Sequence, residues 1–131
     1  METTVDTDLP SISPEDLARL IGRADAPLLL DVRRLPKFSA SEWLLPGARY
    51  CAPEEVQALA ASEPPQDVVV YCVFGHNVSQ DAVRALREAG WNARYLQGGL
   101  EGGEEGVDAP AQIAAWRSAP VPRVRKTAGP A

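Results

Sequence analysis

The chain has 131 residues, of which 45% are hydrophobic and 24% are charged, a balance typical of one globular domain rather than of a disordered chain. Its net charge of −5 repels phosphate backbones, so nucleic acid is not expected as a partner. The apolar runs are only of strand length and the acidic N-terminus lacks the basic and apolar regions of a secretory signal, so we expect no membrane span and a cytoplasmic location.

The first expected element in chain order is a helix that begins after Ser13. The Ser13 hydroxyl can cap this helix, Pro14 suits its first position, and Asp16 follows three residues after the cap. An apolar run over 27–32 then predicts a strand. Because the side chains of this run do not alternate between apolar and polar, we expect both faces of the strand to be covered.

The middle of the chain is expected to alternate between loops, strands and helices. In order, these are a long polar connection at 33–46, a short strand at 47–51, a helix at 53–61, a strand at 67–72, a helix at 78–89 and a strand at 92–96. The strand before Cys72 is the clearest, because it contains three consecutive β-branched valines. The helix that follows has one apolar stripe, and Gly90 is the expected left-handed stop.

The order strand, helix, strand with short links predicts right-handed parallel crossovers. Repeated along the chain, this unit gives the α/β class, with a small parallel β-sheet flanked by helices on both faces. We divide the chain into a flexible N-terminus at 1–11, a folded domain at 12–118 and a Pro-rich, basic tail at 119–131. The domain is expected to end with a loop at 101–106 and a last helix at 108–118, and the basic residues of the tail are expected to be solvated.

The segment from Cys72 to Ser79 is the candidate active loop. It joins the carboxyl end of a buried strand to the start of a helix, where ligands bind in open α/β sheets. Inward-pointing backbone N–H groups and the helix N-terminus would stabilise a thiolate or a persulfide anion at Cys72. We therefore predict Cys72 as the catalytic residue, and a cradle made by the backbone of Val73, Phe74, Gly75, His76, Asn77 and Val78.

Several of these residues also have a simpler structural interpretation. Cys72 could be a small buried hydrophobe at the end of a strand, and Asn77 could form a capping box with Gln80. His76 either supplies positive charge near the sulfur or points to solvent. Cys51 is expected to pack in the core rather than act as a resolving thiol. Two cysteines and one histidine make no metal-ligand set, and no cofactor is expected.

Three motifs resemble the rhodanese-homology domain, and the resemblance covers about 12–100. They are Asp31-Val-Arg33 after the first strand, with Phe38 beyond it; Pro46-Gly-Ala48; and Tyr71-Cys72-x-x-Gly75 with a later Tyr95-Leu-Gln-Gly-Gly99. The resemblance implies a five-stranded parallel sheet and a sulfurtransferase that moves sulfane sulfur from thiosulfate or a persulfide to a thiophilic acceptor through a Cys72 persulfide. Its partners would be small sulfur donors, thiol or cyanide acceptors and a sulfur-accepting protein. Asp31 and Arg33 are expected to support the site by ion pairing.

The chain departs from the family pattern within the active loop. Val73 and Asn77 stand where many members have arginine, Leu44 stands where many have histidine, and the tryptophan expected after Gly99 is absent. Since arginine is the usual partner of oxyanions, a loop without it should hold thiosulfate less well than a persulfide.

These departures leave a second function open, a non-catalytic rhodanese-like module for protein contact or thiol sensing. The loop and the basic tail also resemble rhodanese modules that accompany bacterial chromate-resistance proteins. Phosphatases and arsenate reductases of related fold need an arginine six residues after the cysteine, where this chain has Val78, which argues against their chemistry.

Overall fold

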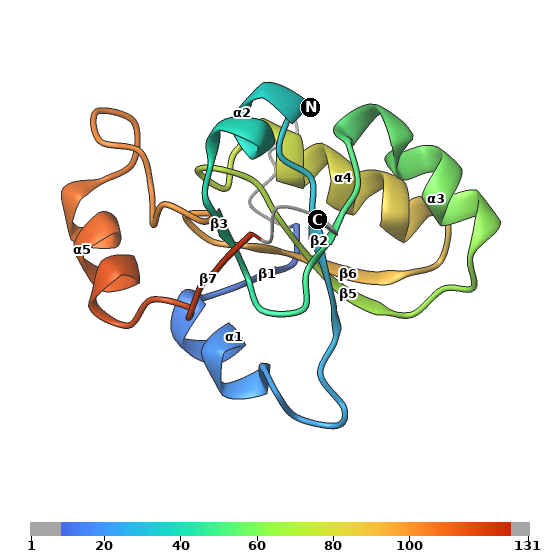
Figure 1. Cartoon of the computed structure of the whole chain (residues 1–131), viewed down its shortest axis with the longest axis horizontal. Helices are drawn as coiled ribbons and strands as arrows, with labels where there is room; N and C mark the ends of the chain where they lie inside the picture. Colours follow the sequence, from blue (N-terminus) through green and yellow to red (C-terminus); the bar gives the residue numbers. More distant parts are fainter. Residues whose placement is uncertain (1–8, 127–131) are drawn as a thin grey trace, which may run out of the picture.

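The computed structural model of the chain describes residues 9–126. Its central sheet has five strands, all parallel, in the order β1-β6-β5-β2-β4 (Figure 1). The strands are β1 (Ser11–Ile12), β2 (Leu28–Asp31), β4 (Arg49–Tyr50), β5 (Asp67–Tyr71) and β6 (Asn92–Leu96). The predicted α/β class with a small parallel sheet is therefore confirmed.

Helices lie on both faces of this sheet, as the sequence predicts. They are α1 (Pro14–Leu20), α2 (Leu35–Ala40), α3 (Val56–Ser62) with the short 3-10 helix η2 (Pro53–Glu55) before it, α4 (Asn77–Glu88) and α5 (Pro110–Ser118). The pair α3 and α4 covers one face and α1 covers the other (Figure 1). No helix in the described part of the chain is long and apolar enough to cross a membrane.

Strand β5 shows why its sequence is continuously apolar. Val68 and Val70 pack in the core on the α3–α4 face, whereas Val69 and Tyr71 pack in the core on the α1 face. Successive side chains of a strand point to opposite faces, so a central strand covered on both sides buries every residue. Each of these four side chains is at most 1% exposed.

The two predicted helix starts turn out differently. The Ser13 hydroxyl accepts the N–H of Asp16 at 3.1 Å and caps α1 as expected. The capping box at Asn77 and Gln80 is wrong, because α4 begins one residue earlier than that pattern requires. Asn77 is the first residue of the helix, His76 is its N-cap, and the Gln80 side chain donates to the carbonyl of Gly75 at 3.2 Å.

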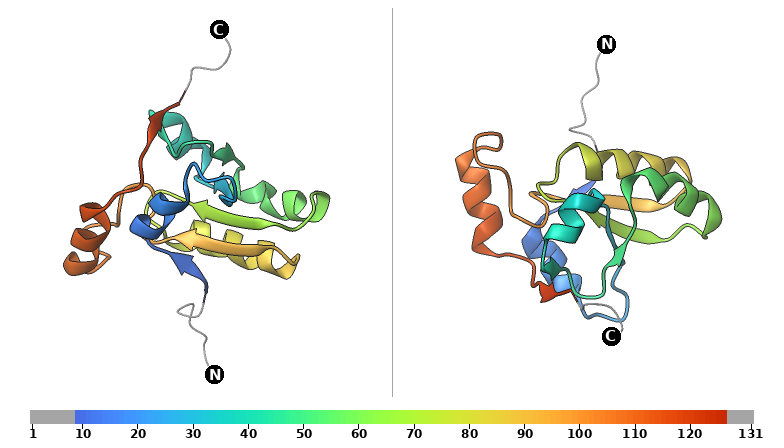
Figure 2. Two further views of the ribbon diagram at one scale, coloured as in Figure 1. Left: turned by 90° about the horizontal axis from the view of Figure 1, so that it is seen from below. Right: turned by 45° about the horizontal axis from the view of Figure 1, so that its top comes forward.

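The connection at 33–46 and the tail are both more structured than the sequence suggests. The connection contains α2 and a short strand β3 (Trp43–Leu44), which pairs antiparallel with β7 (Val124–Arg125) from the tail. Figure 2 shows the C-terminal segment passing from α5 to the side of the molecule that carries α2. The expectation of solvated basic residues is wrong for Arg123 and Lys126, which donate to the carbonyls of Leu100 and Phe38.

Candidate active site

Cys72 directly follows β5, the central strand of the sheet, and the loop after it leads into α4. The loop folds back tightly, so that the N–H of Gly75 donates to Cys72 Sγ at 3.3 Å. Cys72 Sγ in turn donates to the hydroxyl of Ser79, in the first turn of α4, also at 3.3 Å. The sulfur thus lies between a loop amide and the N-terminal turn of a helix, where partial positive charge favours an anion.

A glycine turn after β6 packs directly against the backbone of this loop. Gly75 and Gly99 both have positive φ, +80° and +63°. A Cβ added to Gly99 would lie 2.5 Å from the carbonyl oxygen of Val73 and 2.6 Å from that of Cys72. Only glycine permits so close an approach of two backbone segments in this conformation. The Gly98-Gly99 pair, noted in the sequence only as a family motif, is therefore part of the scaffold of the loop.

The other loop residues have distinct surroundings. Val73 and Phe74 are half-buried, and the ring centroid of Phe74 is 6.2 Å from that of His76. Asn77 is exposed at the start of α4. Val78 packs against the core between the sheet and α4, so its position holds an apolar side chain and no oxyanion-binding cation.

The imidazole of His76 lies between two carboxylates of the loop that follows β6. Its Nε2 is 3.0 Å from Asp108 Oδ2, and its Nδ1 is 3.3 Å from Glu104 Oε1. Asp108 also accepts the backbone N–H of Glu104 at 2.7 Å, which fixes its position. Between the two alternatives for His76, charge near the sulfur or a ring that points to solvent, the structure adds a third feature, the part-buried contact of the ring with these two acids.

Asp31 and Arg33 form a buried ion pair at the carboxyl end of β2. Arg33 Nη2 lies 2.7 Å from Asp31 Oδ2, and the two side chains are 2% and 0% exposed. The phenol of Tyr71 donates to Asp31 at 2.9 Å, and the N–H of Leu45 donates to the same phenol at 3.2 Å. Arg33 also donates to the carbonyl of Trp43 at 2.9 Å. The expected ion pair is thus present, and it braces the segment before Cys72 against the 43–45 segment.

This network changes the acid–base behaviour of Tyr71. Burial, followed by the neighbouring Asp31 carboxylate, raises the pKa of the Tyr71 phenol far above its ordinary value. The phenol therefore stays protonated and keeps donating to the carboxylate. Replacing Asp31 would leave the buried guanidinium of Arg33 without its carboxylate partner, and such a loss typically lowers the free energy of unfolding by about 3–5 kcal/mol.

A groove with a volume of about 370 Å³ leads past the residue next to Cys72. One side consists of α2 and β3 residues and the other of the segment after Gly99. Its lining residues are Arg33, Lys37, Ala40, Ser41, Glu42, Trp43, Val73, Leu100 and Glu101. The groove borders the candidate active loop at Val73, and its charged side chains include both signs.

Cys51 lies nearer to Cys72 in the fold than its sequence position suggests. It follows β4, and the register places Tyr50 beside Asp31 and Asp31 beside Tyr71. The two cysteines therefore stand in one row, two strand spacings or about 10 Å apart. Disulfides need Cα atoms within about 7 Å, and both thiols are free and buried. Burial, with a smaller contribution from Glu55, raises the pKa of the Cys51 thiol, as expected of a packed rather than a reactive cysteine.

Sequence reasoning missed three residues that contact the site. Ser79 could have been found, because a hydroxyl in the first helical turn after a cysteine loop is placed to reach the sulfur. Tyr71 belongs to the family motif before Cys72, but the sequence does not indicate that its hydroxyl bonds to Asp31. Asp108 lies 32 residues from its partner His76; the sequence places it at the start of a helix at 108–118, whereas α5 begins at Pro110 and leaves Asp108 in the preceding loop.

Comparison with known proteins agrees with this geometry. The Rhodanese-like domain family matches residues 13–105 of the chain. No curated protein matches the chain. A rhodanese homolog from the extremely thermophilic bacterium Thermus thermophilus is 30% identical, with a TM-score of 0.55 over 70% of this chain and 98% of that one.

Two further solved structures show the same fold at lower identity. A rhodanese-related protein from Thermoplasma volcanium has a TM-score of 0.62 and 23% identity over 88% of this chain and 97% of its own. A rhodanese-like domain protein from Staphylococcus aureus has a TM-score of 0.62 and 20% identity over 76% and 97%. Since the family match covers most of the chain and coincides with the sheet and the Cys72 loop, this protein belongs to the Rhodanese-like domain family.

Proposed function

We propose that the protein is a sulfurtransferase in which Cys72 carries sulfane sulfur as a persulfide. The Cys72 thiolate attacks the outer sulfur of the donor, a new S–S bond forms, and the donor's S–S bond breaks. The leaving group, sulfite from thiosulfate or a thiolate from a persulfide, takes the electron pair. An acceptor thiolate or cyanide then attacks the outer sulfur and releases the Cys72 thiolate, so the two steps need no cofactor.

The observation that carries this proposal is the position of the sulfur between the Gly75 amide and the Ser79 hydroxyl. Both groups can donate to a negatively charged sulfur, and hydrogen bonds to a charged group are stronger than those to a neutral one. We expect the loop amides ahead of α4 to extend this environment to the outer sulfur of the persulfide. Such donors, fixed before the reaction, stabilise charge that moves from the donor molecule to the protein.

The charges around the loop favour a persulfide donor over thiosulfate. Val73 and Asn77 offer no cation, and the imidazole of His76 is flanked by Glu104 and Asp108. A dianion therefore meets less positive charge than it would in a loop with arginine. We expect low-molecular-weight persulfides to load Cys72 at donor concentrations at least about tenfold lower than thiosulfate requires. Asn77→Arg should narrow this gap, and equal loading of the natural chain by both donors would contradict the expectation.

The direct test is the intact mass of the protein after incubation with thiosulfate or a persulfide donor. One added sulfur should appear, a small thiol or cyanide should remove it, and peptide mapping should place it on Cys72. Cys72→Ser should take up none, whereas Cys51→Ser should load like the natural chain. Sulfur found only on Cys51, or on neither cysteine with any donor, refutes the proposal and favours a non-catalytic protein-contact or thiol-sensing module.

A further inference from the structure

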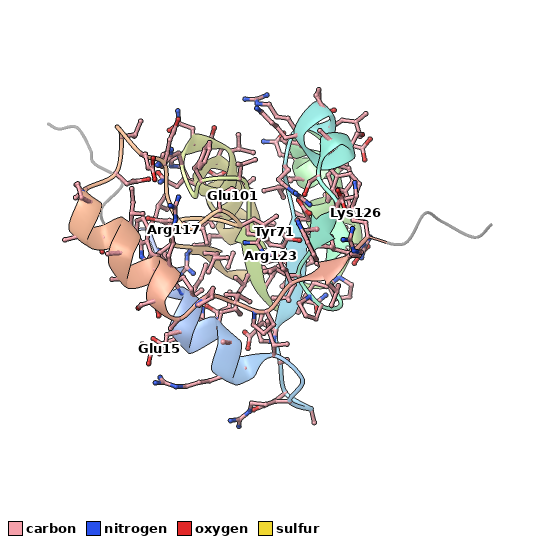
Figure 3. All side chains as sticks on the ribbon, turned by 60° about the vertical axis from the view of Figure 1, so that its left-hand side comes forward. Glu15, Tyr71, Glu101, Arg117, Arg123 and Lys126 are labelled. Atoms are coloured by element: carbon pink, nitrogen blue, oxygen red, sulfur yellow. The ribbon has the colours of Figure 1, made fainter. Side chains whose placement is uncertain are left out.

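The segment 120–126, here called the C-terminal arm, lies beyond the residues that match the family and bonds to both sides of the groove. On one side, Arg123 Nη2 donates to the carbonyl of Leu100 at 2.7 Å. On the other, β7 pairs with β3, and the N–H of Lys126 donates to the carbonyl of Glu42 at 2.7 Å. In Figure 3 Arg123 lies on the arm near Glu101, while Lys126 lies at its far end, toward α2.

The contact with Arg123 continues through one peptide unit to the active loop. The carbonyl of Leu100 that accepts from Arg123 shares a peptide unit with the N–H of Glu101, and this N–H donates to the carbonyl of Val73 at 3.0 Å. One residue earlier, the N–H of Leu100 donates to the carbonyl of Cys72 at 2.9 Å. The backbone of Leu100 and Glu101 thus lies between the arm and the first two carbonyls of the loop, those of Cys72 and Val73.

These two bonds determine where the loop amides point. In a trans peptide the C=O and the N–H point in opposite directions within one plane. Holding the carbonyl of Cys72 therefore orients the N–H of Val73, and holding the carbonyl of Val73 orients the N–H of Phe74. A charged guanidinium that donates to the Leu100 carbonyl also polarises its peptide unit, which strengthens the bond made by the N–H of Glu101.

We infer that Arg123 is a positioning residue for the Cys72 loop, acting through the 100–101 peptide on the carbonyl of Val73 and hence on the Phe74 amide. The inference rests on the proposed function insofar as that amide holds the sulfur. Arg117 adds a parallel contact to the carbonyl of Glu101 at 3.2 Å, but that carbonyl belongs to the next peptide unit. Arg123 is therefore the cationic side chain that bonds to the 100–101 peptide unit, whose N–H donates to the carbonyl of Val73.

The test compares Arg123→Gln, Arg123→Lys and the matched surface control Arg19→Gln in the full chain. Arg19 pairs only with Glu15 and Asp16 of its own helix, among the residues that the structure describes. Arg123→Gln should slow sulfur loading of Cys72 at saturating donor about five- to tenfold, with little change in the half-saturating concentration. Arg123→Lys keeps a charged donor and should stay within about threefold of the natural chain, and Arg19→Gln should have no effect.

Two further measurements separate this inference from the proposed function. Amide hydrogen exchange at Leu100 and Glu101, and the rate of Cys72 alkylation by iodoacetamide, need no sulfur chemistry. Both should change in Arg123→Gln even if no donor loads the natural chain, a result that would refute only the sulfurtransferase proposal. Unchanged exchange and alkylation in Arg123→Gln, or an effect that Arg19→Gln reproduces, would overturn the positioning role.

Discussion

At the scale of single residues, Ser79 is a side chain that bonds to the Cys72 sulfur. Its hydroxyl is fully buried, accepts from Cys72 Sγ and donates to the carbonyl of His76 at 3.3 Å. A hydroxyl can rotate, so once the thiol loses its proton the same oxygen can donate to the sulfur instead. The carbonyl of His76 would still accept the N–H of Gln80, and this exchange would leave no buried group unpaired.

We therefore expect Ser79→Ala to slow the alkylation and the sulfur loading of Cys72 at neutral pH. The loss of one hydrogen bond, worth about 1 kcal/mol, corresponds to about a fivefold lower rate. Ser118→Ala is the matched control, because that hydroxyl makes the same kind of bond within its helix, to the carbonyl of Ala115. Equal rates for Ser79→Ala and the natural chain would show that the hydroxyl does not contribute to reactivity.

At the scale of elements, the turn after β6 and the active loop after β5 form one unit. Adjacent parallel strands bring their carboxyl ends to the same edge of the sheet, and β5 pairs with β6 over four registered positions from Asp67 to Val70. The Gly98-Gly99 turn then lies against the backbone of the loop, closer than any side chain would allow. A change in the turn should therefore alter the position of Cys72 through the backbone contacts of Gly99.

Gly99→Ala tests this coupling, because it adds one carbon facing the carbonyls of Val73 and Cys72. We expect a loss of unfolding free energy of about 2–4 kcal/mol and a strong loss of sulfur loading. The control is Gly106→Ala, which has a similar φ of +86° but no atom within 4 Å of the added carbon. Gly106→Ala should lower the free energy of unfolding by only about 1 kcal/mol and leave the sulfur loading of Cys72 unchanged. Urea unfolding and intact mass measure the two effects, and similar results for both variants would contradict the close approach.

At the scale of the whole molecule, buried acid groups link stability to alkaline pH. The pKa values of the Tyr71 phenol and of the Cys51 thiol are both raised in the folded chain, chiefly by burial. In the unfolded chain these groups ionise near about pH 10 and about pH 8.5, respectively. Between the unfolded and folded pKa values the unfolded chain binds fewer protons, so the free energy of unfolding falls as the pH rises.

We expect stability to be fully present at neutral pH and to decline from about pH 8.5 upward. Each ionising group contributes about 1.4 kcal/mol per pH unit above its unfolded pKa. Tyr71→Phe should be less stable at about pH 7.5 by about 1–3 kcal/mol, since Asp31 loses a buried donor, but should show a shallower decline above about pH 10. Urea unfolding at about pH 7.5, 9 and 10.5 measures both slopes. If the free energy of unfolding falls equally with pH in Tyr71→Phe and in the natural chain, Tyr71 is not a source of the alkaline decline.

The sequence by itself determined the sheet class, the burial of the strand before Cys72 and most helix positions. These features follow from local effects, namely the unalternating apolar run before Cys72, the cap at Ser13 and the stop at Gly90. The same local reasoning missed the start of α4 by one residue, because Asn77 with Gln80 three residues later matches a capping box. In the structure His76 is the N-cap without a side-chain cap bond, and the Gln80 side chain donates to the carbonyl of Gly75 instead.

The tertiary structure alone decided the contacts that link distant segments around the site. These are the pairing of β3 with β7, the bond from Arg123 to Leu100 and the placement of His76 beside Asp108, whose partners are far apart in the sequence. Two-residue strands are too short to show a periodic pattern in the sequence. The sequence around an arginine likewise does not indicate which distant carbonyl accepts its hydrogen bond. Such contacts form only after the sheet has brought the segments together, because the long loops they close lose entropy that no local signal offsets.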